Sequence, residues 1–230
     1  MKTIEITQNV FFDYEVYLYN SYLRKINCSD DYFVPTAYYF SGTNYIDVTK
    51  VDPQECYFYT LYLYNSKCDV DGNIETVSLN CYDNSTFTLY EYTDLKIAAD
   101  SSGTEPTFTH SIESVDLQNN SSFVTFDKAE FIAGINIKNG SNFIYENDIS
   151  VSTNQLPFIK IMEQGQLVAR DNAPVLTFVM PQHLALNNEE THQNTLIHCV
   201  NGFVDVTGIV LDNSVGNFLP IKNINKYDYV

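Results

Sequence analysis

The stretch Cys56-Tyr-Phe-Tyr-Thr-Leu-Tyr-Leu-Tyr-Asn65 interleaves aromatic and aliphatic side chains over ten residues. Two similar runs follow it, Ile74–Tyr82 and Thr86–Thr93, after the polar segments Val70-Asp-Gly-Asn73 and Asp83-Asn84. Short aromatic and β-branched runs bounded by Asn, Asp and Gly predict β-strands joined by tight turns. We therefore predict an antiparallel meander, in which an Asp-Gly turn sets Tyr62 opposite Cys81.

Both faces of this predicted sheet are apolar. One face carries Phe58, Tyr62, Tyr64, Val77, Leu79, Cys81, Tyr90 and Tyr92, and the other carries Tyr57, Tyr59, Leu61, Leu63, Phe87 and Leu89. An antiparallel sheet that meets water on one side should have one polar face. The prediction is that this sheet is covered on both sides, either by the rest of its domain or by a second chain.

Tyrosine is concentrated in the first part of the chain. Residues 1–99 hold 15 of the 18 tyrosines, and the polar stretch 100–106 contains both Gly and Pro. The sequence therefore predicts an all-β protein of two antiparallel β domains, a Tyr-rich domain over 1–99 and a sandwich or jelly-roll-like domain over 107–230, with 100–106 as linker. In the second domain, Asn139-Gly140 and Asn201-Gly202 each lie between apolar runs and indicate hairpins.

A short motif recurs in the first part. Val16-Tyr-Leu-Tyr-Asn-Ser21 is repeated as Leu61-Tyr-Leu-Tyr-Asn-Ser66, at a spacing of 45, whereas a second echo has a spacing of 28. Solenoid proteins have a constant period, so the unequal spacings argue for similar strands with similar neighbours and against a solenoid.

Charge and hydropathy exclude several functional classes. The 230 residues carry a formal charge of −17, spread evenly over both parts, whereas nucleic-acid binding needs clustered Lys and Arg. No run approaches the ~18 apolar residues of a membrane span. The N-terminus has no apolar segment typical of a secretory signal, which predicts cytoplasmic synthesis without signal-dependent export.

The sequence contains no catalytic motif, and we predict neither enzymatic activity nor a cofactor. His183, His192, His198 and Cys199 lie close together in sequence, but at spacings that do not match a metal motif. Asp69-Val-Asp-Gly72 resembles part of a calcium loop, yet Ser78 occupies the position where a bidentate Glu is needed. Two alternatives remain compatible with the sequence: a cation bound loosely at such an acidic turn, and a Cys–His pair formed by residues that are distant in the sequence.

Tyrosine combines an apolar ring with a polar tip and is enriched at protein interfaces. We expect some of the tyrosines to form subunit contacts, and the candidates are Tyr57, Tyr59, Tyr62, Tyr64, Tyr90, Tyr92, Tyr227 and Tyr229.

The all-β pattern, acidic charge, missing signal and richness in Asn, Tyr, Thr and Ser resemble the structural proteins of tailed-bacteriophage virions. This resemblance implies a neck, baseplate, tail-fibre or capsid-decoration subunit located in the virion, with other virion proteins and further copies of itself as partners. The terminal segments Lys2–Phe12 and Asn217–Val230 are expected to act as arms that add a strand to a neighbour. The alternative is a carbohydrate- or receptor-binding β module.

Overall fold

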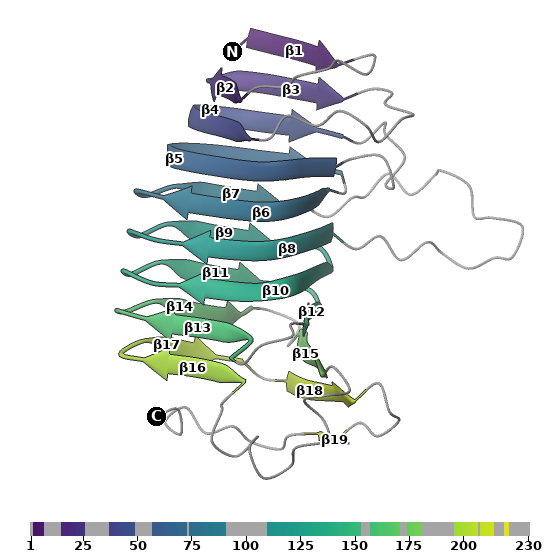
Figure 1. Ribbon diagram of the computed structural model, residues 1–230, viewed down its shortest axis with the longest axis vertical. Coiled ribbons are helices and arrows are strands. Elements are labelled where there is room, and N and C mark those ends of the chain that lie inside the picture. The colour runs from purple at the N-terminus through teal and green to yellow at the C-terminus, as the bar shows by residue number, and fades with distance from the viewer. Residues whose placement is uncertain are drawn as a thin grey trace, which may run out of the picture.

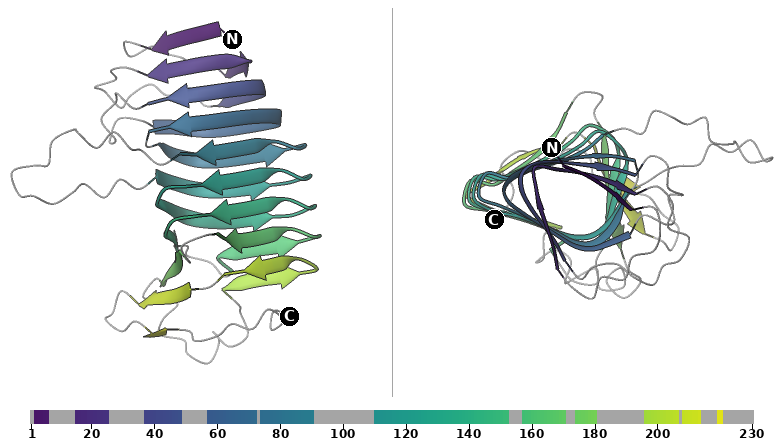
Figure 2. Two further views of the ribbon diagram at one scale, coloured as in Figure 1. Left: turned by 180° about the vertical axis from the view of Figure 1, so that it is seen from behind. Right: turned by 90° about the horizontal axis from the view of Figure 1, so that it is seen from above.

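The computed structural model describes residues 2–6, 15–25, 37–48, 57–72, 74–90, 110–152, 157–170, 174–180, 196–206, 208–213 and 219–220. Within these ranges the chain forms nineteen β-strands and no helix, which confirms the all-β prediction. The strands belong to one sheet that curls into a half-barrel, and successive coils of the chain stack along one axis (Figures 1 and 2).

The coils build two long walls and a shorter side wall. The front wall contains β2 (Val16–Tyr19), the first parts of β4 (Tyr38–Asp47) and β5 (Tyr57–Asp71), β6 (Glu75–Tyr82), β8 (His110–Leu117), β10 (Ala129–Ile137), β13 (Ile159–Met162) and β16 (Ile197–Val200).

The rear wall contains β1 (Lys2–Ile6), β3 (Ser21–Lys25), the second parts of β4 and β5, β7 (Thr86–Leu89), β9 (Ser122–Thr125), β11 (Asn142–Tyr145), β14 (Gln166–Ala169) and β17 (Phe203–Asp205). The side wall continues the start of β10 and contains β12 (Ile149–Ser152), β15 (Val175–Met180) and β18 (Gly208–Asn213), on which β19 (Leu219–Pro220) lies antiparallel.

Every described pairing except β18–β19 is parallel, so the predicted antiparallel domains, meander and sandwich are wrong. Tyr62 lies opposite Asn80, not Cys81, because β6 runs in the same direction as β5. The proposed linker 100–106 lies outside the described residues. On either side of it the sheet is continuous, since β6 pairs with β8 and β7 with β9.

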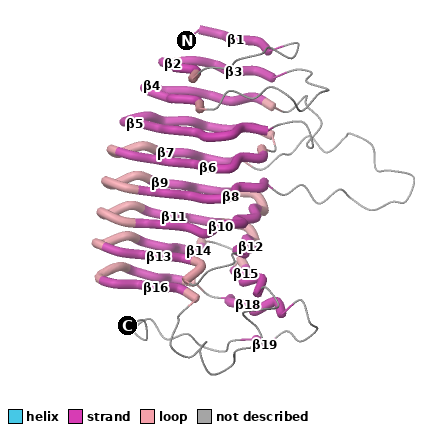
Figure 3. The backbone as a smooth tube through the Cα atoms, viewed as in Figure 1, coloured by secondary structure: helices cyan, strands magenta, loops and turns pink. Residues whose placement is uncertain are grey.

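The corner between the front and rear walls explains the mistaken hairpins (Figure 3). Asparagines at this corner, among them Asn20, Asn65, Asn139 and Asn201, have φ between 45 and 61°. Asparagine tolerates this left-handed conformation, which hairpin turns also use. Asn139-Gly140 therefore does mark a turn, but the turn connects two walls of one coil instead of two antiparallel strands.

A buried serine ladder lines the inside of this corner. The Ser85 amide donates to Ser121 Oγ at 3.2 Å, and the Ser121 amide donates to Ser141 Oγ at 3.1 Å. The Ser121 hydroxyl in turn donates to the Gln118 carbonyl at 2.7 Å. These bonds satisfy backbone groups that the sharp bend would otherwise leave unpaired in the interior.

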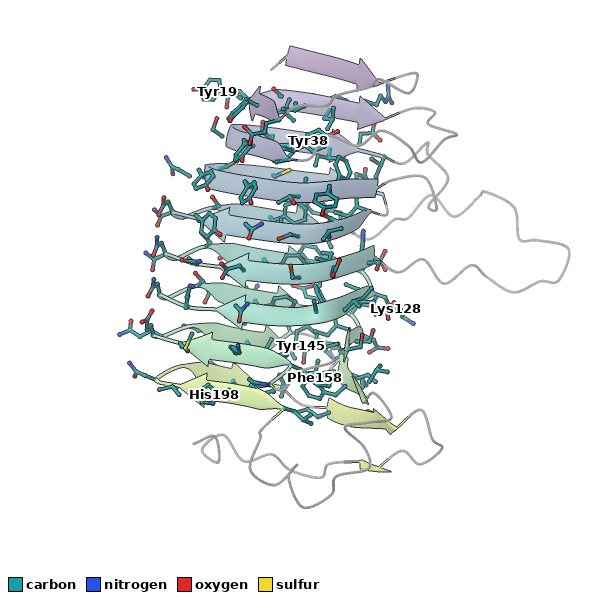
Figure 4. The ribbon with its side chains drawn as sticks, viewed as in Figure 1. Tyr19, Tyr38, Lys128, Tyr145, Phe158 and His198 are labelled. Carbon is teal, nitrogen blue, oxygen red and sulfur yellow. The ribbon has the colours of Figure 1, made fainter. Side chains whose placement is uncertain are left out.

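The interior is filled by residues stacked coil upon coil. Phe87, Phe123 and Phe143 are fully buried, with ring centroids 6.1 and 4.7 Å apart. Tyr145 and Phe158 also lie inside, toward the C-terminal coils (Figure 4). Because each apolar residue contacts its equivalents in the coils above and below, one core runs through the whole stack.

Candidate interaction face

The most distinctive feature of the outer surface is a stack of tyrosines on the front wall. Tyr17, Tyr39 and Tyr62 occupy the same position in three successive coils. Their ring centroids are 4.7 and 4.9 Å apart and their planes differ by 10 and 9°. The spacing is that of neighbouring strands, so the parallel register itself stacks the rings. We call these three residues the tyrosine ladder.

Glu15 lies beside the ladder and accepts hydrogen bonds from two of its hydroxyls. The distances are 2.7 Å from Tyr17 Oη to Oε2 and 3.2 Å from Tyr39 Oη to Oε1. The hydrogen bond to Glu15 is the main cause that raises the pKa of Tyr17, whereas desolvation is the main cause for Tyr39. Both hydroxyls therefore keep their protons at neutral pH and serve as donors.

The residues around the ladder expose aromatic surface to solvent. Exposed fractions are 70% for Tyr17 and 68% for Tyr19, and Tyr59 and Tyr64 reach 49% and 43%. Tyr64 also contacts Tyr82 of the next coil, at 5.3 Å between centroids. Single exposed aromatics are ordinary, but a contiguous group on one wall is typical of a binding surface. We call the ladder together with Tyr19, Tyr59, Tyr64 and Tyr82 the tyrosine face.

The front wall changes character along the solenoid axis. The position occupied by the ladder continues through the later coils as a single row, which we call the front row; after Tyr62 it reads Asn80, Asp116, Asn136, Lys160 and His198. This row is therefore aromatic at its N-terminal end and polar at its C-terminal end, where it carries Lys160 and His198.

A second tyrosine pair on the rear wall is tied to carboxylates. Tyr22 and Tyr45 stack at 5.2 Å, and their hydroxyls donate to Asp47 at 2.6 Å and to Asp71 at 3.0 Å. Arg24 forms an ion pair with Asp47 at 3.1 Å. Asp47 is buried, whereas Glu15 beside the ladder is exposed, so we interpret the rear pair as a structural element.

The structure places three of the eight predicted interface tyrosines together. Tyr59, Tyr62 and Tyr64 lie on the tyrosine face, whereas Tyr90 stacks on Phe126 at the rear, at 5.5 Å. Tyr57 lies in β5, but its side chain is outside the described residues, as are Tyr92, Tyr227 and Tyr229.

The sequence prediction missed Tyr17, Tyr19 and Tyr39, although the signal was present. The repeated Tyr-Leu-Tyr-Asn-Ser motif spans two coils, because Tyr17 pairs with Tyr39 and Tyr39 pairs with Tyr62. The coil from Tyr62 to Asn80 is shorter than these two, and the coil from Asn80 to Asp116 is much longer. Because the coils differ in length, a solenoid need not show a constant period in its sequence, and the argument against a solenoid was wrong.

The residues considered for chemistry do not form a reactive site within the described ranges. Burial raises the pKa of the Cys68 and Cys81 thiols, so both stay protonated. Cys199 and His110 lie in different coils and at different positions along the strands, so they do not form a pair. Among the described residues no three His, Cys, Asp or Glu groups are placed to hold a metal. His183, His192, Cys28 and Cys56 lie outside these ranges.

His110 is instead an interior residue. Its Nδ1 accepts a hydrogen bond from the Ile74 amide at 3.3 Å, and its Nε2 lies 3.7 Å from Asp127 Oδ2, too far for a hydrogen bond. Burial lowers the pKa of His110 to about 4, so the ring is neutral at physiological pH.

The terminal segments expected to act as arms are partly described. Lys2–Ile6 pairs with β3 of its own chain, and Leu219–Pro220 pairs with β18, whereas the rest of both segments lies outside the described residues.

Comparison with known proteins finds no match to a family, to a curated protein or to a solved structure. In the part of the chain that the structure describes, no helix is long and apolar enough to cross a membrane.

Proposed function

We propose that the chain is a non-enzymatic structural subunit of a virus particle that binds neighbouring proteins through the tyrosine face. The observation that carries the proposal is the ladder of Tyr17, Tyr39 and Tyr62 on the outer surface of a stacked β-sheet, flanked by exposed Tyr19 and Tyr64. Tyrosine supplies large contact area with little loss of side-chain entropy, which suits a permanent contact surface.

The solenoid supports this role because it presents the side chains on a stiff frame. Each coil is held by parallel hydrogen bonds to its neighbours and by the continuous core, so the rings need little ordering when a partner binds. The resemblance in composition to tailed-bacteriophage structural proteins directs the proposal toward a particle component.

The stacking geometry disfavours the alternative of carbohydrate binding by the ladder. Sugar recognition by aromatic residues uses the ring faces, and Tyr39 lies between Tyr17 and Tyr62 with both of its faces covered. The ladder presents ring edges and hydroxyls instead, which fit the mixed apolar and polar surface of a protein partner.

The test is incorporation into purified particles, measured by quantitative mass spectrometry. The chain should be present in fixed stoichiometry, and a triple variant Tyr17→Ser, Tyr19→Ser and Tyr64→Ser should be depleted at least about tenfold. The matched control replaces three outward residues of the rear wall, Val124→Ser, Ile144→Ser and Val168→Ser. Absence of the unmodified chain from particles, or equal incorporation of both variants, would overturn the proposal.

A further inference from the structure

The side chains of the front row can pair with those of the same row in a second copy that runs in the opposite direction. From the N-terminal coil to the C-terminal coil the row reads Tyr17, Tyr39, Tyr62, Asn80, Asp116, Asn136, Lys160 and His198. Read against its reverse, this order sets tyrosines opposite His198 and Lys160, and Asn80 opposite Asp116. Each of these combinations can form a hydrogen bond.

In the adjacent row, two positions further along each strand, reversal sets Tyr19 opposite Val200, Tyr64 opposite Lys138 and Tyr82 opposite Gln118. The N-terminal end of this row carries Tyr19 and Tyr64, and its C-terminal end carries Lys138 and Val200. Tyr19 and Val200 are the exposed apolar residues at the two ends, at 68% and 50%. Figure 4 shows Tyr19 near one end of the stack and His198 near the other.

Charge is also favourable for self-association at this wall. The two rows together contain one carboxylate, Asp116, against Lys138 and Lys160, although the whole chain carries −17. Glu15 lies at the aromatic end beside Tyr39, and Lys160 is exposed at the other end. Along these two rows, two copies can therefore approach with little repulsion.

The wall is large enough for a weak, concentration-dependent interface. The shortest front strands carry two outward positions each. Eight coils at ~4.8 Å give a length of about 34 Å, and two rows with their side chains give a width of about 13 Å. The resulting area of about 440 Å² is below the ~800 Å² that each partner buries in a standard interface, so we expect association in the micromolar range.

We propose that the tyrosine face binds a second copy of this chain in a two-fold dimer whose solenoid axes are antiparallel. The two-fold axis runs along the strand direction between the apposed front walls, so each row faces itself in reverse order. Tyr39 then meets the partner's Lys160, close to Glu15, and Tyr19 meets the partner's Val200. The proposal rests on the proposed function, since it names the partner of the same face.

In a two-fold dimer every contact between the two copies occurs twice, so one charge-reversing substitution alters two contacts and is a sensitive test. Sedimentation velocity of the full chain between about 1 and 100 µM at physiological ionic strength should show a species of twice 26.3 kDa. Lys160→Glu places a carboxylate beside Glu15 and should raise the dimer dissociation constant at least about tenfold. Glu15→Lys alone should weaken the dimer similarly, and the double variant Glu15→Lys/Lys160→Glu should restore it.

Lys128→Glu is the matched control, because Lys128 is exposed at the edge of the stack (Figure 4), outside both rows, and the charge change is the same. Its dissociation constant should equal that of the unmodified chain, and circular dichroism should confirm that all variants are folded. A monomer at the highest concentration, equal weakening by Lys128→Glu, or failure of the double variant to recover would overturn the inference. A monomer that still enters particles would overturn the dimer and leave the proposed function standing.

Discussion

Two aromatic ladders run along the same solenoid on opposite sides of the sheet. Phe87, Phe123 and Phe143 stack inside, with centroids as close as 4.7 Å, and Tyr17, Tyr39 and Tyr62 stack outside with the same closest spacing. The inner rings are fully buried, whereas Tyr17 is 70% exposed. The parallel register produces both stacks. They differ in burial: the buried ladder stabilises the fold, and the exposed ladder is available for contacts with a partner.

Ionisable side chains outside and inside the sheet also differ. Outside, the charge of Glu15 is tolerated because water reaches it and two tyrosine hydroxyls donate to it. Inside, His110 is neutral because the interior penalises its charged form. We therefore expect substitutions in the inner ladder to lower the stability of the fold and substitutions in the outer ladder to weaken association.

The largest effect is expected from breaking the inner ladder. Phe123→Ala removes a ring that contacts Phe87, Phe131 and Phe143, and should lower the free energy of unfolding by about 3–5 kcal/mol. Urea denaturation followed by circular dichroism measures this change. Phe123→Leu, which keeps most of the volume, should cost about 1.5 kcal/mol or less. Equal losses in the two variants would contradict the assigned packing role.

A smaller effect is expected from acidification of the interior. The pKa of His110 is about 4 in the folded chain and about 6.5 when unfolded, so the unfolded state binds the proton more tightly. The contribution of neutral His110 to stability is fully present above about pH 6.5 and is lost as the pH falls toward 4. The loss amounts to about 3 kcal/mol once the pH is below about 4.

Denaturation at a series of pH values checks this expectation against His110→Gln, which keeps an acceptor for the Ile74 amide. The variant should lose less stability between about pH 6.5 and pH 4 than the unmodified chain. Carboxylates contribute equally in both proteins, so identical slopes would show that His110 is not the titrating group.

The smallest effect on stability is expected from the outer ladder. Tyr39→Ser removes two exposed stacking contacts and should lower the free energy of unfolding by less than about 1.5 kcal/mol. The same change should weaken the dimer at least about tenfold, as measured by sedimentation. A large loss of stability with unchanged association would reverse the roles assigned to the two ladders.

Local features of the fold could be predicted from the sequence, and the direction of the strands could not. Asn139-Gly140 predicts a turn because Asn and Gly adopt positive φ readily, and the turn is present. The same conformation serves a hairpin and a solenoid corner, so the residues alone do not reveal whether the chain comes back antiparallel or continues around a coil.

The interface prediction was limited for the same reason. Tyr62 and Tyr64 lie in the long aromatic run and were predicted as contact residues, whereas Tyr17 and Tyr39 were not. Tyr39 becomes the centre of the ladder only because it lies beside Tyr17 and Tyr62, which are each one full coil away along the chain. Such long-range pairs are set by register, which a sequence motif does not specify.

The sequence by itself determined most β-strands, some of the turn positions, the large apolar core and the acidic charge, because these depend on side-chain type and local backbone preference. Only the tertiary structure decided that the strands are parallel, which side of each strand is buried, and that one row of the front wall begins with tyrosines and ends with Lys160 and His198. Those properties depend on hydrogen bonds between strands that are a whole coil apart in the sequence, and the length of each coil varies along the chain.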